Sequence, residues 1–108
     1  MDKLNCADLY IDFKSRIGIN IVQFGSYTCA PCSAIKQRID SWIEDHPAIM
    51  SLYVPIEEFP QIAASEGIFS VPTILVYING QMTIRESGYF SLDNIFDKIE
   101  RYIEIIEL

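Results

Sequence analysis

The sequence of 108 residues is poor in the residues that would mark several common classes of protein. It has one histidine and three cysteines, too few for a framework of several disulfides. Lysine and arginine together number 8 against 15 aspartates and glutamates, which gives a net charge of −7. Because nucleic acids and anionic membranes would repel such a chain, we expect neither as a partner.

Long apolar runs are also missing. No stretch approaches the ~18 apolar residues of a membrane span, and residues 1–6 lack the apolar core of an export signal. Without an export signal we expect a cytoplasmic protein, in a compartment that keeps thiols reduced. No repeat, linker or low-complexity segment divides the chain, so residues 1–108 are predicted to form a single domain, and we expect it to be a monomer.

One motif with a specific chemistry is present, the C-x-x-C sequence Cys29-Ala30-Pro31-Cys32. It follows the apolar run 19–24 and precedes a helical pattern, so it is predicted to lie where a strand turns into a helix. The free N–H groups and dipole of a helix N-terminus stabilise an anion. We therefore predict that Cys29 is the nucleophilic thiolate and that Cys32, one turn further, resolves the mixed disulfide.

A structural zinc site is the alternative interpretation of this spacing, but such a site needs four ligands. The other candidates for ligands are Cys6 and His46, and neither belongs to a second pair. We therefore expect no metal, and no cofactor other than the redox-active disulfide of the motif itself. Cys6 is expected to pack in the first helix as a small hydrophobic residue, and His46 to lie on the surface at a helix C-terminus.

Hydrophobic periodicity and turn residues predict helices and strands in the order α–β–α–β–α–β–β–α. The β–α–β part requires a parallel pair with a right-handed crossover, and Asn79-Gly80 is typical of a hairpin turn. The predicted fold is therefore α/β, with a mixed central sheet of about four strands flanked by helices on both faces. Helices are expected over 5–16, 33–45, 60–66 and from a cap at Ser91 onward, and strands over 19–25, 49–54, 73–78 and 81–87.

Two of these helices carry apolar faces that should be buried. In the first helix the face comprises Leu4, Leu9, Phe13 and Ile17. In the last helix the apolar stripe runs from Leu92 through Ile95, Phe96, Ile99 and Ile103 to Ile106.

Several motifs occur together at characteristic distances: Phe24, the C-x-x-C motif, Ser70-Val71-Pro72-Thr73, Asn79-Gly80 and Gly88. In this combination the chain resembles the thioredoxin family over nearly its whole length. The resemblance implies the thioredoxin fold, with Pro72 in the cis form opposite Cys29. It also implies that the backbone of Val71 pairs with an extended substrate segment, in a groove formed by Thr28, Ala30, Pro31, Val71, Pro72 and Gly88, with Tyr27 at its rim.

Three positions near the motif depart from the family pattern. Thr28 stands where the family usually has an aromatic residue, and Gly25 stands where it has a tryptophan. Gln23 replaces a buried acid that is thought to move the proton of the resolving cysteine. Glutamine can donate and accept hydrogen bonds but cannot take up a proton. We expect water or Cys29 to activate Cys32 instead, exchange to be slower, and Gln23 and Thr73 to support the site.

The resemblance implies a thiol–disulfide oxidoreductase that reduces protein disulfides. Its electron donor would resemble thioredoxin reductase. The departures at Gln23 and Thr28 favour an alternative, a thioredoxin-like binding module or redox-regulated adaptor with weak or no general reductase activity.

Overall fold

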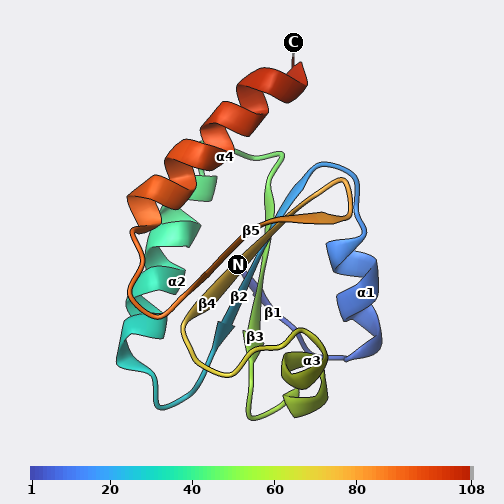
Figure 1. Ribbon diagram of the computed structural model, residues 1–108, viewed down its shortest axis with the longest axis vertical. Coiled ribbons are helices and arrows are strands. Elements are labelled where there is room, and N and C mark those ends of the chain that lie inside the picture. The colour runs from blue at the N-terminus through green and yellow to red at the C-terminus, as the bar shows by residue number, and fades with distance from the viewer. Residues whose placement is uncertain (108) are drawn as a thin grey trace.

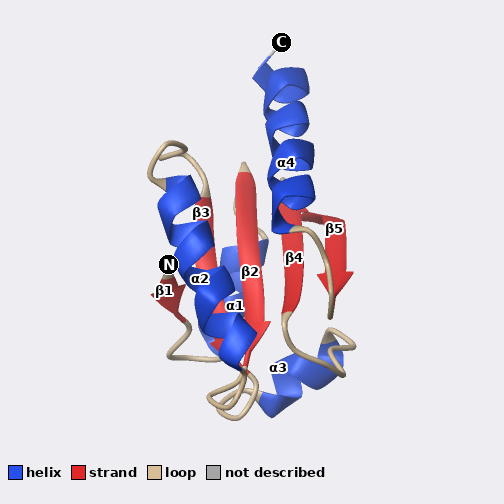
Figure 2. Ribbon diagram, turned by 90° about the vertical axis from the view of Figure 1, so that its left-hand side faces the viewer, coloured by secondary structure: helices blue, strands red, loops and turns tan. Residues whose placement is uncertain are grey.

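The computed structural model describes residues 1–107, which form a mixed five-stranded sheet between two layers of helices (Figure 1). The strand order is β1-β3-β2-β4-β5, with β2 in the centre, and Figure 2 shows the strands side by side. Along the chain the elements are β1 (Asp2–Lys3), α1 (Asp8–Lys14), β2 (Ile19–Gly25), α2 (Ala30–Ile43), β3 (Met50–Pro55), α3 (Pro60–Ser65), β4 (Thr73–Ile78), β5 (Gln81–Ser87) and α4 (Leu92–Glu107).

The central strand β2 pairs in parallel with β3 and antiparallel with β4. All of its residues are buried, as expected for an apolar strand covered on both faces. Strands β4 and β5 form a hairpin through Asn79 and Gly80, whose φ angles of 51° and 83° suit a tight turn. The predicted bounds of β2, β4 and β5 are confirmed.

The two faces of the sheet are covered by different helices, α2 and α4 on one face and α1 and α3 on the other (Figure 1). Successive side chains of a strand point to opposite faces. On β2, Ile21 therefore packs in a core with Ile39 and Ile99, whereas Phe24 packs in a second core with Tyr10. Each face has its own hydrophobic cluster, and β2 contributes to both.

The structure corrects the expected strand count and the first helix. The sheet has five strands, because the two-residue strand β1 pairs in parallel with the edge of β3. Helix α1 begins at Asp8, later than predicted, and its buried residue is Tyr10. Of the predicted apolar face, Leu4 is buried and Phe13 packs against the same cluster as Tyr10. Leu9 and Ile17 are instead 51% and 92% exposed, and the helix ends before Ile17.

Other corrections concern helix ends. Helix α2 begins at Ala30 rather than at residue 33, which makes Cys29 its N-cap. The predicted cap of α4 is confirmed, because the Asn94 N–H donates to Ser91 Oγ at 3.2 Å. Ile106, however, is 51% exposed, because the last turns of α4 extend past the sheet (Figure 1). Cys6 precedes α1 and is exposed rather than packed within a helix.

No helix within residues 1–107 is both long enough and apolar enough to cross a lipid bilayer.

Candidate dithiol site

The C-x-x-C motif lies where the sequence predicted it, between the end of β2 and the first turn of α2. Cys29 is the N-cap and has an extended backbone. Pro31 lies in the first helical turn, where a backbone N–H would have no partner within the helix, so its lack of an N–H costs no hydrogen bond. Cys29 and Cys32 form a disulfide with their Cα atoms 5.4 Å apart. Cys29 is half-buried, whereas Cys32 is 0% exposed. An external reactant can therefore approach the disulfide only from the side of Cys29.

A carboxylate from another loop holds the segment that leads into Cys29. Glu57, which follows β3, accepts hydrogen bonds from the Ser26 hydroxyl at 2.5 Å and from the Tyr27 N–H at 3.1 Å. The Ser26 carbonyl in turn accepts from the Cys29 N–H at 3.2 Å, and the hydroxyls of Ser26 and Thr28 lie 3.1 Å apart. No sequence motif marks Glu57, an acid far along the chain, as a partner of this loop.

The Val71-Pro72 peptide bond is cis, as the family resemblance implied. The turn is tied to the end of β5 by two contacts. The Gly88 N–H donates to the Pro72 carbonyl at 3.0 Å, and Thr73 Oγ1 lies 2.9 Å from Ser87 Oγ. Thr73 is 1% exposed, so it supports the turn from beneath and does not face solvent.

A groove of about 710 Å³ lies between α2, the cis-proline turn and the segment before α4. Four of the predicted groove residues line it, namely Pro31, Val71, Pro72 and Gly88. The remaining lining residues, which sequence reasoning did not find, are Ile35 and Arg38 of α2 and the segment 89–92.

Thr28 and Ala30 are exposed beside the groove but do not line it. Successive helical residues point about 100° apart, so Ala30 faces a different direction from Pro31. Gly88 has a φ of +74°, and a Cβ at this position would have no heavy atom within 4 Å. Its left-handed backbone, rather than crowding inside the protein, therefore accounts for the glycine.

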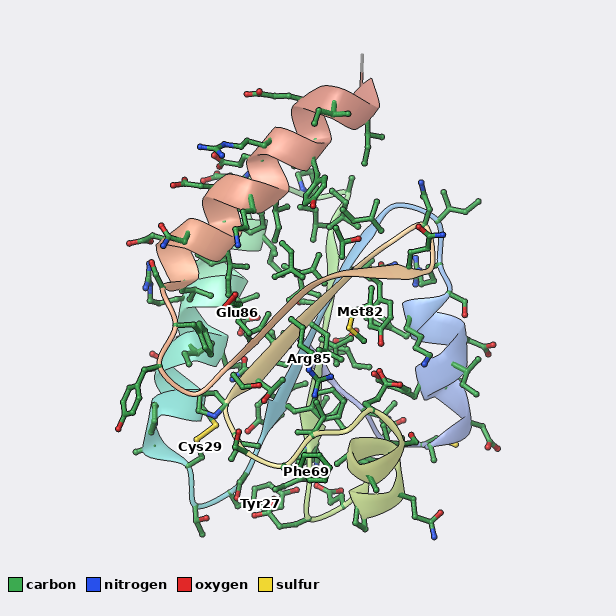
Figure 3. The ribbon with its side chains drawn as sticks, in the orientation of Figure 1. Tyr27, Cys29, Phe69, Met82, Arg85 and Glu86 are labelled. Atoms are coloured by element: carbon green, nitrogen blue, oxygen red, sulfur yellow. A yellow bond between two sulfur atoms is a disulfide. The ribbon has the colours of Figure 1, made fainter. Side chains whose placement is uncertain are left out.

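Three aromatic side chains are exposed on the loops around the motif. Tyr27 is 63% exposed, Phe69 is 94% exposed, and Tyr89 is fully exposed. Figure 3 shows Tyr27 and Phe69 at the same end of the molecule as Cys29. Large apolar groups gathered at one place on a surface are typical of a contact site for a partner. Phe69 and Tyr89 stand alone in loops, where no periodic pattern could mark them.

Gln23 lies on the side of β2 that faces α2, and it contacts the backbone of Cys32. It is 0% exposed, and its Nε2 donates to the Cys32 carbonyl oxygen at 2.8 Å. Its Oε1 is buried and has no hydrogen-bond partner within residues 1–107. The expected support of the motif by Gln23 thus takes the form of one hydrogen bond to the backbone of Cys32.

Tyr53 occupies the space that a larger residue would fill at Gly25. It is the β3 partner of Gln23 in the sheet register. A Cβ at position 25 would lie 2.1 Å from Tyr53 Oη, so a side chain there would displace the ring. Burial, together with the nearby charge of Glu57, raises the pKa of Tyr53, which keeps its hydroxyl protonated. The departure at Gly25 is therefore coupled to a tyrosine on the neighbouring strand.

No group of three or more histidine, cysteine, aspartate or glutamate residues within residues 1–107 could hold a metal ion. His46 stacks on Trp42 with ring centroids 3.9 Å apart. Its Nδ1 lies 2.9 Å from the Trp42 carbonyl oxygen, and its Nε2 lies 3.6 Å from Glu100 Oε1. These contacts place His46 at the end of α2 as a packing residue, away from the two cysteines of the motif.

Comparison with known proteins agrees with this geometry. The family model for thioredoxin matches residues 10–101. A curated thioredoxin of Staphylococcus saprophyticus is 26% identical over 98 residues, which are 90% of this chain and 94% of that protein.

Solved structures show the same fold. Plasmodium falciparum thioredoxin superposes with a TM-score of 0.83 at 22% identity, covering 94% of this chain and 99% of that one. Mitochondrial thioredoxin 3 of Saccharomyces cerevisiae gives 0.82 at 18% identity, covering 94% of each chain.

Proposed function

Since the chain belongs to the thioredoxin family, we propose that it reduces disulfides in other proteins with the Cys29–Cys32 pair. Family membership and the disulfide support thiol–disulfide oxidoreductase activity. The observation that carries the finer proposal is the asymmetry of the pair. Cys29 is half-buried at a helix N-terminus, whereas Cys32 is 0% exposed, so one thiol can meet a bulky substrate and the other can meet only its neighbour.

The reaction consists of two exchanges. The Cys29 thiolate, stabilised by the N-terminus of α2, attacks one sulfur of a substrate disulfide and releases the other sulfur as a thiolate. Cys32 then loses its proton and attacks Cys29 Sγ, which releases the second substrate thiolate and restores the Cys29–Cys32 disulfide. Two electrons pass from the protein to the substrate. Because Gln23 cannot take up a proton, and Cys29 Sγ is bonded to the substrate in the mixed disulfide, water accepts the proton that Cys32 loses.

The substrate segment is proposed to lie in the groove, extended along Val71 and Pro72 and close to Gly88. Thr28, Ala30 and Tyr27 would form its rim. A protein similar to thioredoxin reductase would return the electrons, and the chain would act as a cytoplasmic monomer without binding nucleic acid or membranes. The acidic charge of −7 supports the last point.

Insulin reduction with dithiothreitol as the electron source tests the proposal. Cys29→Ser should abolish activity above the dithiothreitol background, because no attacking thiolate remains. Cys32→Ser should stop after one exchange, since the mixed disulfide has no resolving thiol. Cys6→Ser is the matched control and should retain activity, because Cys6 is exposed outside the site. Full activity of Cys29→Ser would contradict the proposal.

The exposed aromatic side chains favour a second candidate, a binding module whose redox chemistry is secondary. Tyr27, Phe69 and Tyr89 offer contact area around the groove, while Gln23 lacks an acid's ability to speed resolution. Trapping with Cys32→Ser separates the two candidates. A general reductase should form mixed disulfides with many proteins, whereas a binding module should form them with one or none.

A further inference from the structure

The side-chain amide of Gln23 has one possible orientation. Its contact at 2.8 Å is with the carbonyl oxygen of Cys32, which can only accept a hydrogen bond, so the atom facing it must be the NH₂ group. The amide oxygen is therefore the atom that has no partner among the described residues. This oxygen is bonded to the same carbon as the nitrogen that contacts the Cys32 backbone, so it belongs to an amide group held against Cys32.

A buried acceptor without a donor destabilises the state in which it occurs. In the disulfide form neither sulfur carries a hydrogen, and Cys32 can offer Gln23 nothing but its backbone. Reduction changes this. The S–S bond breaks, two thiols of glutathione supply two electrons and become one disulfide, and two protons reach the cysteine sulfurs. One of these protons makes Cys32, which is 0% exposed, a new buried donor.

We propose that Gln23 Oε1 accepts a hydrogen bond from the Cys32 thiol once the disulfide is reduced. This inference deepens the proposed redox function of the pair and rests on it. Gln23 is then a positioning residue that favours the dithiol form and holds a proton on Cys32. A stabilised reduced form makes a dithiol a weaker reductant, and a retained proton slows the attack on Cys29. Both effects lengthen the life of a mixed disulfide.

The equilibrium with a glutathione redox buffer is the first test, using full-length protein and the Gln23→Leu variant. Removal of the acceptor should shift the equilibrium constant toward the disulfide by about threefold to tenfold, which is roughly 15–30 mV in potential. Ser51→Ala is the matched control. Ser51 Oγ is the other buried polar atom without a partner among the described residues, and Ser51 lies on the neighbouring strand opposite Ile21. Its loss should leave the constant unchanged.

An unchanged constant in Gln23→Leu, or a shift in the opposite direction, would overturn the proposal. So would an equal shift in Ser51→Ala, because the effect would then belong to any unpaired buried group.

A spectroscopic test keeps the proposal falsifiable if Gln23→Leu does not fold. In a Cys6→Ser/Cys29→Ser double variant, Cys32 carries the last remaining thiol. Its S–H stretching band in the infrared should lie at a lower frequency than that of a thiol without an acceptor. A band at the unbonded position would overturn the proposal. Neither test uses a protein substrate, so failure of the proposed reductase function would not be mistaken for failure of this inference.

Discussion

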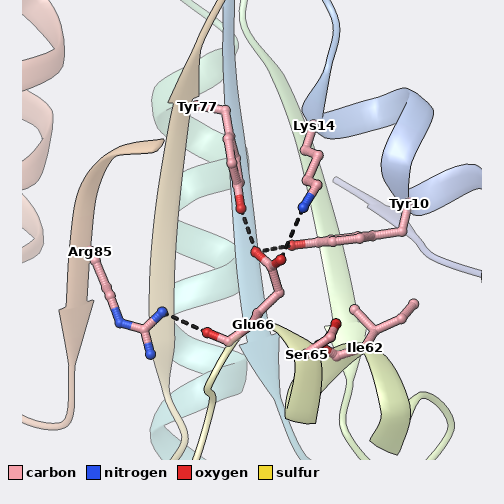
Figure 4. A network of polar contacts seen from close by, with 7 residues as sticks. All are labelled: Tyr10, Lys14, Ile62, Ser65, Glu66, Tyr77 and Arg85. Carbon is pink, nitrogen blue, oxygen red and sulfur yellow. Dashed lines mark hydrogen bonds and ion pairs between the residues drawn. The ribbon is translucent and has the colours of Figure 1, made fainter. Parts of the chain in front are cut away.

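Two polar side chains are buried on opposite faces of the same sheet, and their surroundings differ. On the face covered by α1 and α3, the Glu66 carboxylate accepts hydrogen bonds from Tyr77 Oη, from Tyr10 Oη at 3.1 Å and from Lys14 Nζ at 3.0 Å (Figure 4). On the face covered by α2 and α4, Gln23 donates one hydrogen bond, and its Oε1 has no partner within residues 1–107. We call the first group, Glu66 with Tyr10, Lys14 and Tyr77, the Glu66 network.

Protonation states within the Glu66 network are those that its hydrogen bonds require. Burial by itself would raise the pKa of Glu66, but hydrogen bonds from Tyr77, Lys14 and Tyr10 and the charge of Lys14 lower it below its usual value. Burial and the neighbouring Glu66 raise the pKa values of Tyr10 and Tyr77. The carboxylate is therefore ionised and both hydroxyls keep the protons that they donate.

Arg85 connects the Glu66 network to the segment that leads to the groove. Arg85 on β5 donates to the carbonyl oxygens of Glu66 at 2.8 Å and of Gly67 at 2.7 Å. These contacts bind α1, α3, β4 and β5 together just before the chain continues to the cis Pro72. A network with all its partners makes a region rigid, so this face supplies a fixed frame for one wall of the groove.

The two faces of the sheet differ in how completely their polar side chains are hydrogen-bonded. The paired polar groups around Glu66 lie away from the disulfide, whereas Gln23, whose Oε1 has no partner within residues 1–107, contacts the backbone of Cys32. The predictions below separate stability on the Glu66 face from chemistry on the Gln23 face.

The largest effect is expected from Glu66→Leu, which leaves two buried hydroxyls and an ammonium group without their acceptor. The free energy of unfolding should fall by about 3 kcal/mol, measured by urea denaturation, while the equilibrium with glutathione stays the same. Glu58→Leu is the matched control. Glu58 pairs with Lys3 at the surface, so its loss should cost less than about 1 kcal/mol. A large change in redox equilibrium in Glu66→Leu would show that the faces are not separate.

Gly25→Ala should have the next largest effect, on the Gln23 face. The new methyl group would lie 2.1 Å from Tyr53 Oη, and the ring must move away from its position. We expect a loss of about 2 kcal/mol in the free energy of unfolding. The double variant with Tyr53→Ala should lose less than the sum of the two single variants, because the crowding is removed. Strict additivity in this double-mutant cycle would contradict the coupling of the two residues.

Arg85→Met should have a smaller effect, because Arg85 is exposed and its two acceptors are backbone carbonyls that water can reach. Stability should fall by about 1 kcal/mol. The informative readout is insulin reduction, where KM should rise about threefold with kcat nearly unchanged, since the cis-proline wall of the groove is held less firmly. An equal fall in kcat and kcat/KM would argue against a role in positioning that wall.

The smallest effect is a difference in pH dependence between wild type and Glu66→Gln. A carboxyl group whose pKa is lowered in the folded state adds stability above its unfolded pKa, and this stability is lost as the pH falls through the folded pKa. Wild type should therefore lose more stability than Glu66→Gln between pH 6 and the acid range. Chemical denaturation at several pH values measures it. Parallel curves would show that Glu66 has the same pKa in both states.

Sequence patterns predicted those parts of the fold whose signals are local. Strands β2, β4 and β5 are apolar or β-branched runs next to turn residues, and their bounds agree with the structure. Strand β1 has two residues, too few for any periodicity, and it exists because it pairs with β3. In α1 the buried position is Tyr10 because of the partner that its hydroxyl finds in Glu66, which helical periodicity could not show.

The candidate site was predictable to a similar degree. The C-x-x-C motif and the Val71-Pro72 turn are short motifs that the chain carries by itself. Glu57 and Tyr53 contact the motif region from β3 and the loop after it. Their roles depend on distances that only the folded chain sets.

The sequence by itself determined that a dithiol begins a helix after a buried strand, because residues adjacent along the chain create that arrangement. Only the tertiary structure decided the environment of the two buried polar groups. Gln23 meets Cys32 from 9 residues away, and Glu66 meets Tyr10 and Lys14 from 56 and 52 residues away. Hydrogen bonds between such distant groups form only when packing brings them within about 3 Å and excludes water. Packing brings three hydrogen-bond donors to the Glu66 carboxylate. It brings none to Gln23 Oε1 from residues 1–107.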